Sequence, residues 1–316
     1  MKRTTLSMLV SVRGQCSTAL LVIAAGIASG MALAQTSDDF SVSGSVEAGA
    51  EYNSNVSVSE LESASGESDV AGNLEAGIDA NWQATDRLSV DTGYSYSGQR
   101  YQDVDTFDLD LHLLYGDVSY EFDAFSLGSN YYYADANLGG DDFLTLKQYS
   151  VYAGKLFADQ WFLRGALNFA DKSFDDFAQR DADTEGLSLD AFWFFNQGRS
   201  SIVLGYAFDE EQTRDPAFSY DADTLRLRYS QRFELIGKDT ELSLGTRWQD
   251  RNYQTVTPGL GARRDDRQHI TEAALEVSVT DSLVTIVKLE RGDFQSNLDS
   301  ADYTENRASV SLKLSF

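Results

Sequence analysis

Apolar and polar residues alternate along most of this chain beyond residue 39. In the segment 40–52, Val42, Ala48 and Tyr52 share one face, and serine and glutamate residues occupy most of the positions between them. Successive side chains of a β-strand point to opposite faces, so this period of two predicts a strand with one apolar and one polar face. Beyond Gln35 the chain has no run of about 18 apolar residues, which excludes a helical membrane protein.

The same alternation recurs in fourteen segments and continues to the last residue. Strands are expected at residues 40–52, 70–82, 88–96, 107–122, 125–133, 144–156, 161–172, 187–195, 202–208, 225–233, 242–248, 273–279, 283–289 and 308–316. In one segment Leu144 and Leu146 conflict in parity with the residues that follow. In another, parity changes between Tyr115 and Val118, which predicts a β-bulge near Gly116.

Short and long connections alternate between these segments. Six short ones lie near 83–86, 123–124, 157–160, 196–200, 235–239 and 280–282. Seven others, mostly longer and acidic, lie near 53–68, 97–105, 135–142, 173–183, 209–219, 249–268 and 293–302. This count fits fourteen antiparallel strands with both termini on the side of the short turns. Pro216 and Pro258 lie in long connections, as expected for strands that need every backbone donor.

Aromatic residues gather at both ends of the expected strands. Those near the short turns are Phe40, Trp82, Phe122, Phe125, Trp161, Phe195, Phe233 and Phe316; those towards the long connections are Tyr52, Tyr94, Tyr96, Tyr131, Tyr133, Phe169, Tyr206, Phe208, Tyr220 and Trp248. Two aromatic belts around an aliphatic band are typical of outer-membrane barrels, whose sheet must close to pair every backbone group. We therefore predict an all-β protein, a transmembrane antiparallel up-and-down β-barrel of about 14 strands. A secreted β-sandwich or β-helix is the alternative.

The two ends of the chain indicate export to the outer membrane. Residues 1–34 resemble a cleaved signal peptide, with an apolar stretch at 19–28 and an Ala-x-Ala site at its end, which leaves a barrel over 35–316. An uncleaved anchor is the alternative. The last strand ends on Phe316 and resembles the C-terminal recognition strand of Gram-negative outer-membrane proteins. That resemblance implies the barrel assembly machinery as a partner and places both barrel termini in the periplasm.

The composition narrows the class further. The 50 Asp and Glu residues against 25 Lys and Arg give a net charge of −25, which excludes a basic nucleic-acid binder. One cysteine excludes a disulfide scaffold, and an aromatic content of 12% is too high for a disordered acidic chain. Acidic connections would face lipopolysaccharide, where they either bind divalent cations or are simply solvated.

The polar faces carry charges of both signs. Candidate pore-lining residues on these faces are Arg164, Arg226, Arg228, Arg232, Arg247, Asp108, Asp110, Glu272 and Glu276. One interpretation is a selectivity stripe for anionic solutes, with facing carboxylates that create a transverse field. The other is structural: the charges pair across the lumen and fill it, because unpaired buried charges are costly.

Candidate catalytic chemistry is sparse. The two histidines, His112 and His269, have no partners at the spacing of a catalytic or metal site. Asp108, Asp110 and His112 would share one inward row, which suits a proton or metal site but also arises from alternation alone. We expect no catalytic residues, no metal and no cofactor, and hence a protein that is not an enzyme.

Two local stretches resemble a known family. The turn Glu51-Tyr52-Asn53-Ser54-Asn55-Val56 and the ending Tyr303-Thr304-Glu305-Asn306-Arg307-Ala308, followed by a terminal Phe, resemble the opening turn and closing strand of the barrel of the surface lipoprotein assembly modifier family. The resemblance implies a fourteen-stranded barrel and a lipoprotein partner. Members of that family carry a helical repeat domain before the barrel, whereas this chain is expected to begin its first strand a few residues after the cleavage site.

The sequence supports two functions. The first is a porin-like passive channel with a charged lumen for small hydrophilic solutes. The alternative is a translocation or interaction barrel similar to the surface lipoprotein assembly modifiers, for which the Asn-x-Asn turn is the hint.

Overall fold

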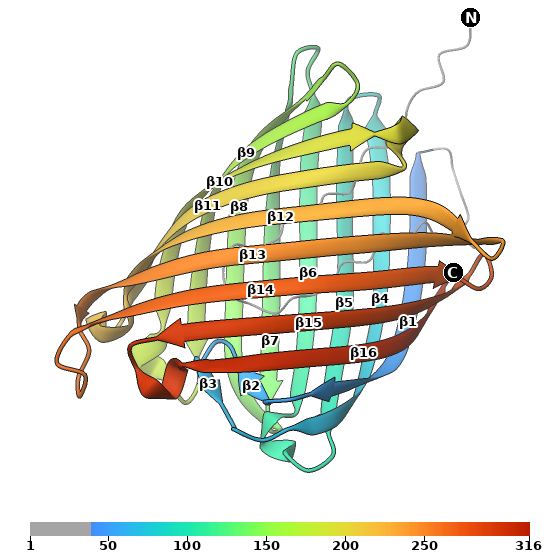
Figure 1. Ribbon diagram of the computed structural model, residues 1–316. Helices are drawn as coiled ribbons and strands as arrows, with labels where there is room; N and C mark the ends of the chain where they lie inside the picture. The colour runs from blue at the N-terminus through green and yellow to red at the C-terminus, as the bar shows by residue number, and fades with distance from the viewer. Residues whose placement is uncertain (1–38) are drawn as a thin grey trace, which may run out of the picture.

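The protein is a closed barrel of fourteen antiparallel strands (Figure 1). The computed structural model describes residues 39–316, so the signal peptide predicted for residues 1–34 lies outside the described residues. The barrel strands are β1 (Phe40–Asn53), β4 (Asp69–Thr85), β5 (Leu88–Tyr101), β6 (Leu109–Glu121), β7 (Ser126–Leu138), β8 (Asp141–Phe157), β9 (Trp161–Phe174), β10 (Ala182–Phe195), β11 (Ser200–Thr213), β12 (Tyr220–Leu235), β13 (Lys238–Val256), β14 (Arg263–Ser278), β15 (Leu283–Ser296) and β16 (Tyr303–Ser315). The fold class expected from alternation is confirmed.

Each barrel strand pairs with its neighbours in sequence, and β1 pairs with β16 to close the sheet. The closing ladder runs from Ser45 opposite Ser315 to Asn53 opposite Arg307. Beyond it, Gly44 and Phe316 exchange two backbone hydrogen bonds, of 2.7 and 2.9 Å. Both ends of the barrel chain therefore lie at one rim, which we call the terminus end, and the other rim is the loop end.

Two short strands, β2 (Ser57–Val58) and β3 (Ser63–Ala64), form a separate hairpin between β1 and β4. In Figure 1 they lie at the lower left, away from the C terminus. Five single-turn 3-10 helices complete the secondary structure of residues 39–316: η1 (Asp105–Phe107), η2 (Ala178–Arg180), η3 (Asn196–Gly198), η4 (Pro216–Phe218) and η5 (Asp299–Ala301). No helix among residues 39–316 is long and apolar enough to cross a membrane.

The barrel strands extend beyond their expected limits at the loop end. The long connection predicted for 135–142 is wrong: β7 and β8 are joined by Gly139 and Gly140 alone, both with positive φ. Two glycines in this conformation form the tight turn that a twisted hairpin favours. Other connections are also shorter than predicted. A strand that extends beyond the apolar band is polar on both faces, so its sequence resembles a loop although its backbone is still paired.

The outer face of the barrel is apolar, with aromatic residues near both rims. At the terminus end Trp161 and Trp193 stack with ring centroids 5.3 Å apart, and at the loop end Tyr52 and Trp248 are exposed. Tyr220 was expected in this belt, and that expectation is wrong. Its side chain is buried inside the barrel, because its position on β12 has the parity of the inward residue Arg226 rather than of Leu225.

The bulge predicted near Gly116 is absent, since β6 pairs with both neighbours in one continuous register. Leu111 is therefore buried inside the barrel, while Leu114 and Val118 are exposed on the outer face. The parity conflict of the sequence has a different cause: inward leucines at one end of β6, and outward leucine and valine at the other.

Leucines with inward parity also explain the conflict in β8. Leu144 and Leu146 are buried inside the barrel, whereas Tyr149 is exposed outside. They belong to an apolar cluster on the inner wall, which comprises Leu111, Ala134, Ala136, Phe143, Leu144, Leu146 and Phe174. We call this set the apolar wall cluster, and it lies on β6 to β9.

Candidate functional site at the loop end

The connection from β1 to β4 enters the barrel and carries the β2–β3 hairpin across the lumen. Val58 and Leu61 of the hairpin pack against the apolar wall cluster. Its tip residue Glu62 reaches arginines on β13 and β14. Because β6 to β9 and β13 to β14 lie on opposite sides of the closed strand order, the hairpin spans the lumen from wall to wall.

The base of the hairpin connection is held at the β1–β16 seam. Asn53 Nδ2 donates to Glu305 Oε1 at 2.9 Å, and Ser57 Oγ donates to Glu305 Oε2 at 2.6 Å. Asn55 Nδ2 donates to the Thr304 carbonyl at 3.1 Å. Arg307 also contacts Glu305. The two stretches with the family resemblance thus meet across the seam, and we call these contacts the seam clasp.

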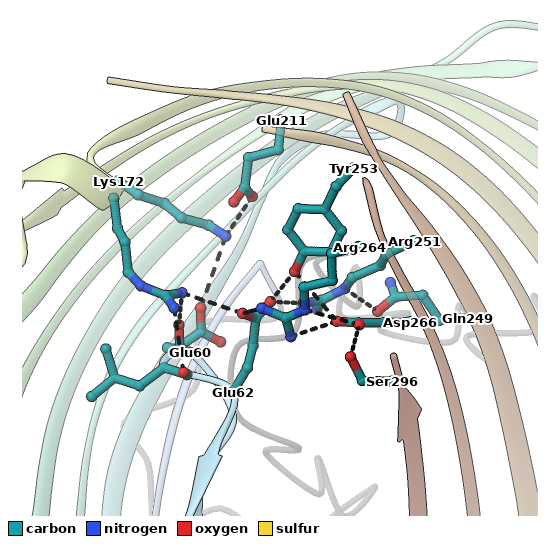
Figure 2. A network of polar contacts seen from close by, with 12 residues as sticks. Glu60, Glu62, Lys172, Glu211, Gln249, Arg251, Tyr253, Arg264, Asp266 and Ser296 are labelled. Atoms are coloured by element: carbon teal, nitrogen blue, oxygen red, sulfur yellow. Dashed lines mark hydrogen bonds and ion pairs between the residues drawn. The ribbon is translucent and has the colours of Figure 1, made fainter. Parts of the chain in front are cut away.

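Glu62 is the centre of a buried polar network (Figure 2). Arg251 Nη1 lies 2.9 Å from Glu62 Oε1, and Arg264 Nη1 lies 2.7 Å from Glu62 Oε2. Tyr253 donates its hydroxyl to Oε1 at 2.6 Å, and Arg180 Nη1 is 3.5 Å from Oε2. Both carboxylate oxygens are therefore fully engaged. We call Arg180, Arg251, Tyr253 and Arg264 the arginine seat.

The charge state of Glu62 follows from these neighbours. Burial raises the pKa of Glu62, but the opposing effect of Arg251, Arg264 and Arg180 is larger and lowers the pKa to about 2. The carboxylate is therefore ionised at every physiological pH. An ionised carboxylate with three guanidinium partners in a buried site is a strong, geometrically defined contact.

Glu60, two residues before Glu62, has a different environment. Lys172 Nζ lies 2.7 Å from Glu211 Oε2 but 3.8 Å from Glu60 Oε2, so Glu60 has the weaker share of this cation. Glu60 Oε1 has no hydrogen-bond partner among the described residues. Burial, partly offset by Lys172, raises the pKa of Glu60 to about 7.

Most charges predicted for the lumen lie on the inner wall, and four of them, Arg226, Arg228, Arg232 and Glu272, form ion pairs there. Arg226 Nη2 is 3.5 Å from Asp190, Arg228 Nη2 is 2.5 Å from Glu272, and Arg232 Nε is 2.7 Å from Glu241. Arg164 stacks on the Tyr152 ring at 4.1 Å. Arg247 and Glu276 occupy inward positions on β13 and β14, in register with Ile270 and Glu241.

Asp108 and Asp110 do not line the lumen. Asp108 precedes β6 and accepts a hydrogen bond from the Tyr101 backbone N–H. Asp110 faces outward, because the continuous register of β6 gives it the parity of Leu114, and it pairs with Arg100 at 2.6 Å. The expected inward row of Asp108, Asp110 and His112 is therefore wrong.

Neither histidine faces the lumen. His112 contacts the Tyr94 hydroxyl at 2.7 Å on the outer face, and His269 stacks on Trp248 with ring centroids 5.1 Å apart. Among residues 39–316 no group of three or more His, Cys, Asp or Glu side chains is arranged to hold a metal ion.

The residues of the arginine seat were not predicted from the sequence. Arg180, Arg251 and Arg264 fall in stretches predicted to be acidic connections, and Glu62 belongs to a connection whose acidic residues were expected either to bind divalent cations or to be solvated. A buried strand end in this barrel carries polar residues on both faces, so its pattern resembles that of a loop. One usable signal was the placement of Arg251 and Tyr253 at inward parity on an extended β13.

Solved structures with the same fold are outer-membrane proteins. OmpT of Vibrio cholerae, described as an outer membrane protein, superposes with a TM-score of 0.54 at 12% sequence identity, covering 89% of this chain and 99% of that one. An anion-selective porin from Comamonas acidovorans gives a TM-score of 0.52 at 10% identity, with 88% and 99% covered. At such identities the likeness defines the fold alone, which is that of an outer-membrane β-barrel.

The family model for surface lipoprotein assembly modifiers matches residues 40–316. The chain therefore belongs to the surface lipoprotein assembly modifier family, and the resemblance carried by its Asn-x-Asn turn and closing strand is confirmed. A search of curated protein sequences finds no match.

Proposed function

We propose that this protein is a translocation and display barrel for surface lipoproteins, closed at rest by the β2–β3 hairpin. One observation carries the proposal: the hairpin crosses the lumen and is fixed at both walls, by apolar packing on one side and the arginine seat on the other. A hairpin fixed across the lumen would obstruct passive diffusion through it until the hairpin is released. Membership of the family supplies the class of cargo.

The proposal places the barrel in the outer membrane of a Gram-negative bacterium, with both barrel termini in the periplasm. The loop end would then face outward, towards lipopolysaccharide. The barrel assembly machinery would recognise the strand that ends at Phe316. The protein acts without enzymatic chemistry or a cofactor, and its direct partner is a lipoprotein.

The test compares the full mature protein with a variant whose hairpin, residues 57–64, is replaced by a short Gly-Ser linker. In planar bilayers we expect the natural protein to be mostly closed and the variant to conduct steadily. In cells, surface exposure of a co-expressed lipoprotein is expected to require the barrel. Steady, full conductance of the natural protein together with unchanged lipoprotein exposure in its absence would contradict the proposal.

A second candidate is a passive channel with a charged lumen. It is favoured by the walls below the hairpin, where Arg226 and Arg228 lie on β12, across the closed strand order from the inward carboxylates Asp79 and Asp91 of β4 and β5. Such facing charges create a transverse field in a pore. The same bilayer experiment separates the two functions, because this candidate requires conductance with the hairpin in place.

A further inference from the structure

We propose that the arginine seat is a binding site for acidic segments of a translocated polypeptide, and that Glu62 occupies it as a built-in substitute. The inference rests on the proposed function, since it gives the substrate class of the same lumen. It concerns the class of ligand that the seat takes once the hairpin tip has left.

The seat is held together without help from Glu62. Asp266 accepts from Arg264 Nε at 2.9 Å and from Arg264 Nη2 at 2.6 Å. Gln249 Oε1 accepts from Arg251 Nε at 3.0 Å. The Arg180 guanidinium lies over the Phe218 ring at 4.4 Å. The partners of Arg251 and Arg264 lie on the barrel strands β13 and β14, so these two donors stay pointed at the same place when the carboxylate is withdrawn.

An empty seat would be electrostatically costly. Three guanidiniums converge there. Among the described side chains that touch them, two carry a carboxylate, namely Glu62 of the hairpin and Asp266 of β14. The side chains of Arg251 and Arg264 are only 3% and 4% exposed. Removing one partner of a buried ion pair leaves an uncompensated charge that water solvates poorly. An incoming oxyanion therefore replaces Glu62 more readily than solvent does.

The surroundings of the seat fit a peptide better than a small anion. The hairpin tip presents Glu60, Leu61 and Glu62, and each meets a matching group: Lys172 for Glu60, the apolar wall cluster for Leu61 and the arginine seat for Glu62. The wall groups that bind this acidic, apolar, acidic triplet of the hairpin can bind the same triplet in another polypeptide. A free anion would use the arginines alone.

The test measures binding of a fluorescein-labelled peptide, Gly-Glu-Leu-Glu-Gly, to the detergent-solubilised mature protein by fluorescence anisotropy. We expect Glu62→Gln to bind at least about tenfold more tightly than the natural protein, because the internal competitor has lost its charge. Glu67→Gln is the matched control on the same connection, at an exposed position, and should leave the affinity unchanged.

Further arms define the site and the ligand. Adding Arg251→Gln to Glu62→Gln should remove the gain, and the milder Arg180→Gln serves the same purpose if the first pair does not fold. A Gly-Gln-Leu-Gln-Gly peptide should fail to bind. Free glutamate or inorganic phosphate at the same concentration of negative charge should not displace the peptide.

Equal affinity of the natural protein and Glu62→Gln would overturn the proposal, as would a gain that survives the arginine substitutions. Displacement by glutamate or phosphate would assign the seat to small solutes and overturn the peptide assignment. These outcomes are independent of lipoprotein exposure in cells, so failure of this inference is distinguishable from failure of the proposed function.

Discussion

Two glutamates in one hairpin tip show how strongly the charge state of a residue depends on its neighbours. Glu60 and Glu62 are both buried, yet burial dominates the pKa of Glu60 and raises it to about 7, whereas three arginines outweigh burial at Glu62 and lower its pKa to about 2. One carboxylate therefore titrates near neutrality and the other does not. The sequence presents them as equivalent acidic residues of one loop.

This difference predicts that closure of the barrel depends on pH. The pKa of Glu60 is higher in the seated hairpin than its ordinary value of 4.5, so rising pH weakens seating between about 4.5 and 7, where only a released Glu60 is ionised. Glu62 stabilises seating above 4.5 and loses this effect only as the pH falls towards 2. Lys172, Glu211, Glu62 and Arg251 are the charged groups that act on Glu60. Open probability in planar bilayers should rise from about pH 5 to pH 7.5.

Glu60→Gln removes the titrating group and should flatten this dependence. A pH profile of Glu60→Gln that matches the natural protein would show that another group controls closure.

A second prediction at the residue scale concerns the lumen charges. Arg228 pairs with Glu272 at 2.5 Å on the inner wall. In the variant that lacks the hairpin, Arg228→Glu is expected to shift ion selectivity towards cations, because it replaces a positive wall charge by a negative one. Arg267→Glu, whose side chain is 69% exposed on the outer face, is the control and should leave the reversal potential unchanged. An unchanged potential in Arg228→Glu itself would make this arginine purely structural.

At the scale of elements, the seam between the first and last strands differs from the other contacts in the barrel. Its ladder covers Ser45–Asn53 of β1, whereas the pairing of β1 with β4 covers the full strand from Phe40 to Asn53. The loop end of this short seam is reinforced by the seam clasp, with Glu305 as the acceptor for Asn53 and Ser57. The same clasp fixes the base of the hairpin connection, so the β1–β16 seam and the hairpin that crosses the lumen are held by the same contacts.

Glu305→Ala is expected to destabilise both features. It leaves the buried amide of Asn53 without its acceptor and leaves Arg307 with the more distant Glu290, 3.9 Å away, a loss on the order of 1–3 kcal/mol for an unsatisfied buried donor. The heat-induced shift in electrophoretic mobility of the folded barrel should occur at lower temperature, and bilayer recordings should show more frequent opening. Glu185→Ala, on the exposed face of β10, serves as the control. If both variants unfold at the same temperature as the natural protein, the seam clasp does not contribute to stability.

At the scale of the whole molecule, closure of the sheet is what allows this chain to cross a membrane. Each barrel strand pairs with a neighbour on both sides, so no strand edge is left with unpaired backbone groups where the barrel faces lipid. The β2–β3 hairpin is a separate two-stranded sheet and is not part of the closed barrel sheet. The barrel should therefore tolerate changes in the hairpin far better than changes in the seam.

Deletion of Phe316 tests the role of the last residue. Its backbone pairs with Gly44 at the terminus end, which is the last rung of the seam rather than its centre. We expect refolding in detergent to be nearly unaffected, whereas assembly into the outer membrane of cells should fall several-fold if the assembly machinery recognises this residue. Equal loss in both settings would indicate a structural role instead.

The sequence by itself determined the barrel: the strand count, the apolar outer face and the inward positions of Arg164, Arg226 and Arg228 all follow from a period of two. That period is local, because each strand obeys it independently of its partners. Only the tertiary structure decided which charges meet. Glu62 lies 118 to 202 residues from the arginines that bind it, and Glu305 lies 252 residues from Asn53. No local pattern encodes contacts across a closed lumen, since they depend on the path of a connection that has no periodicity of its own.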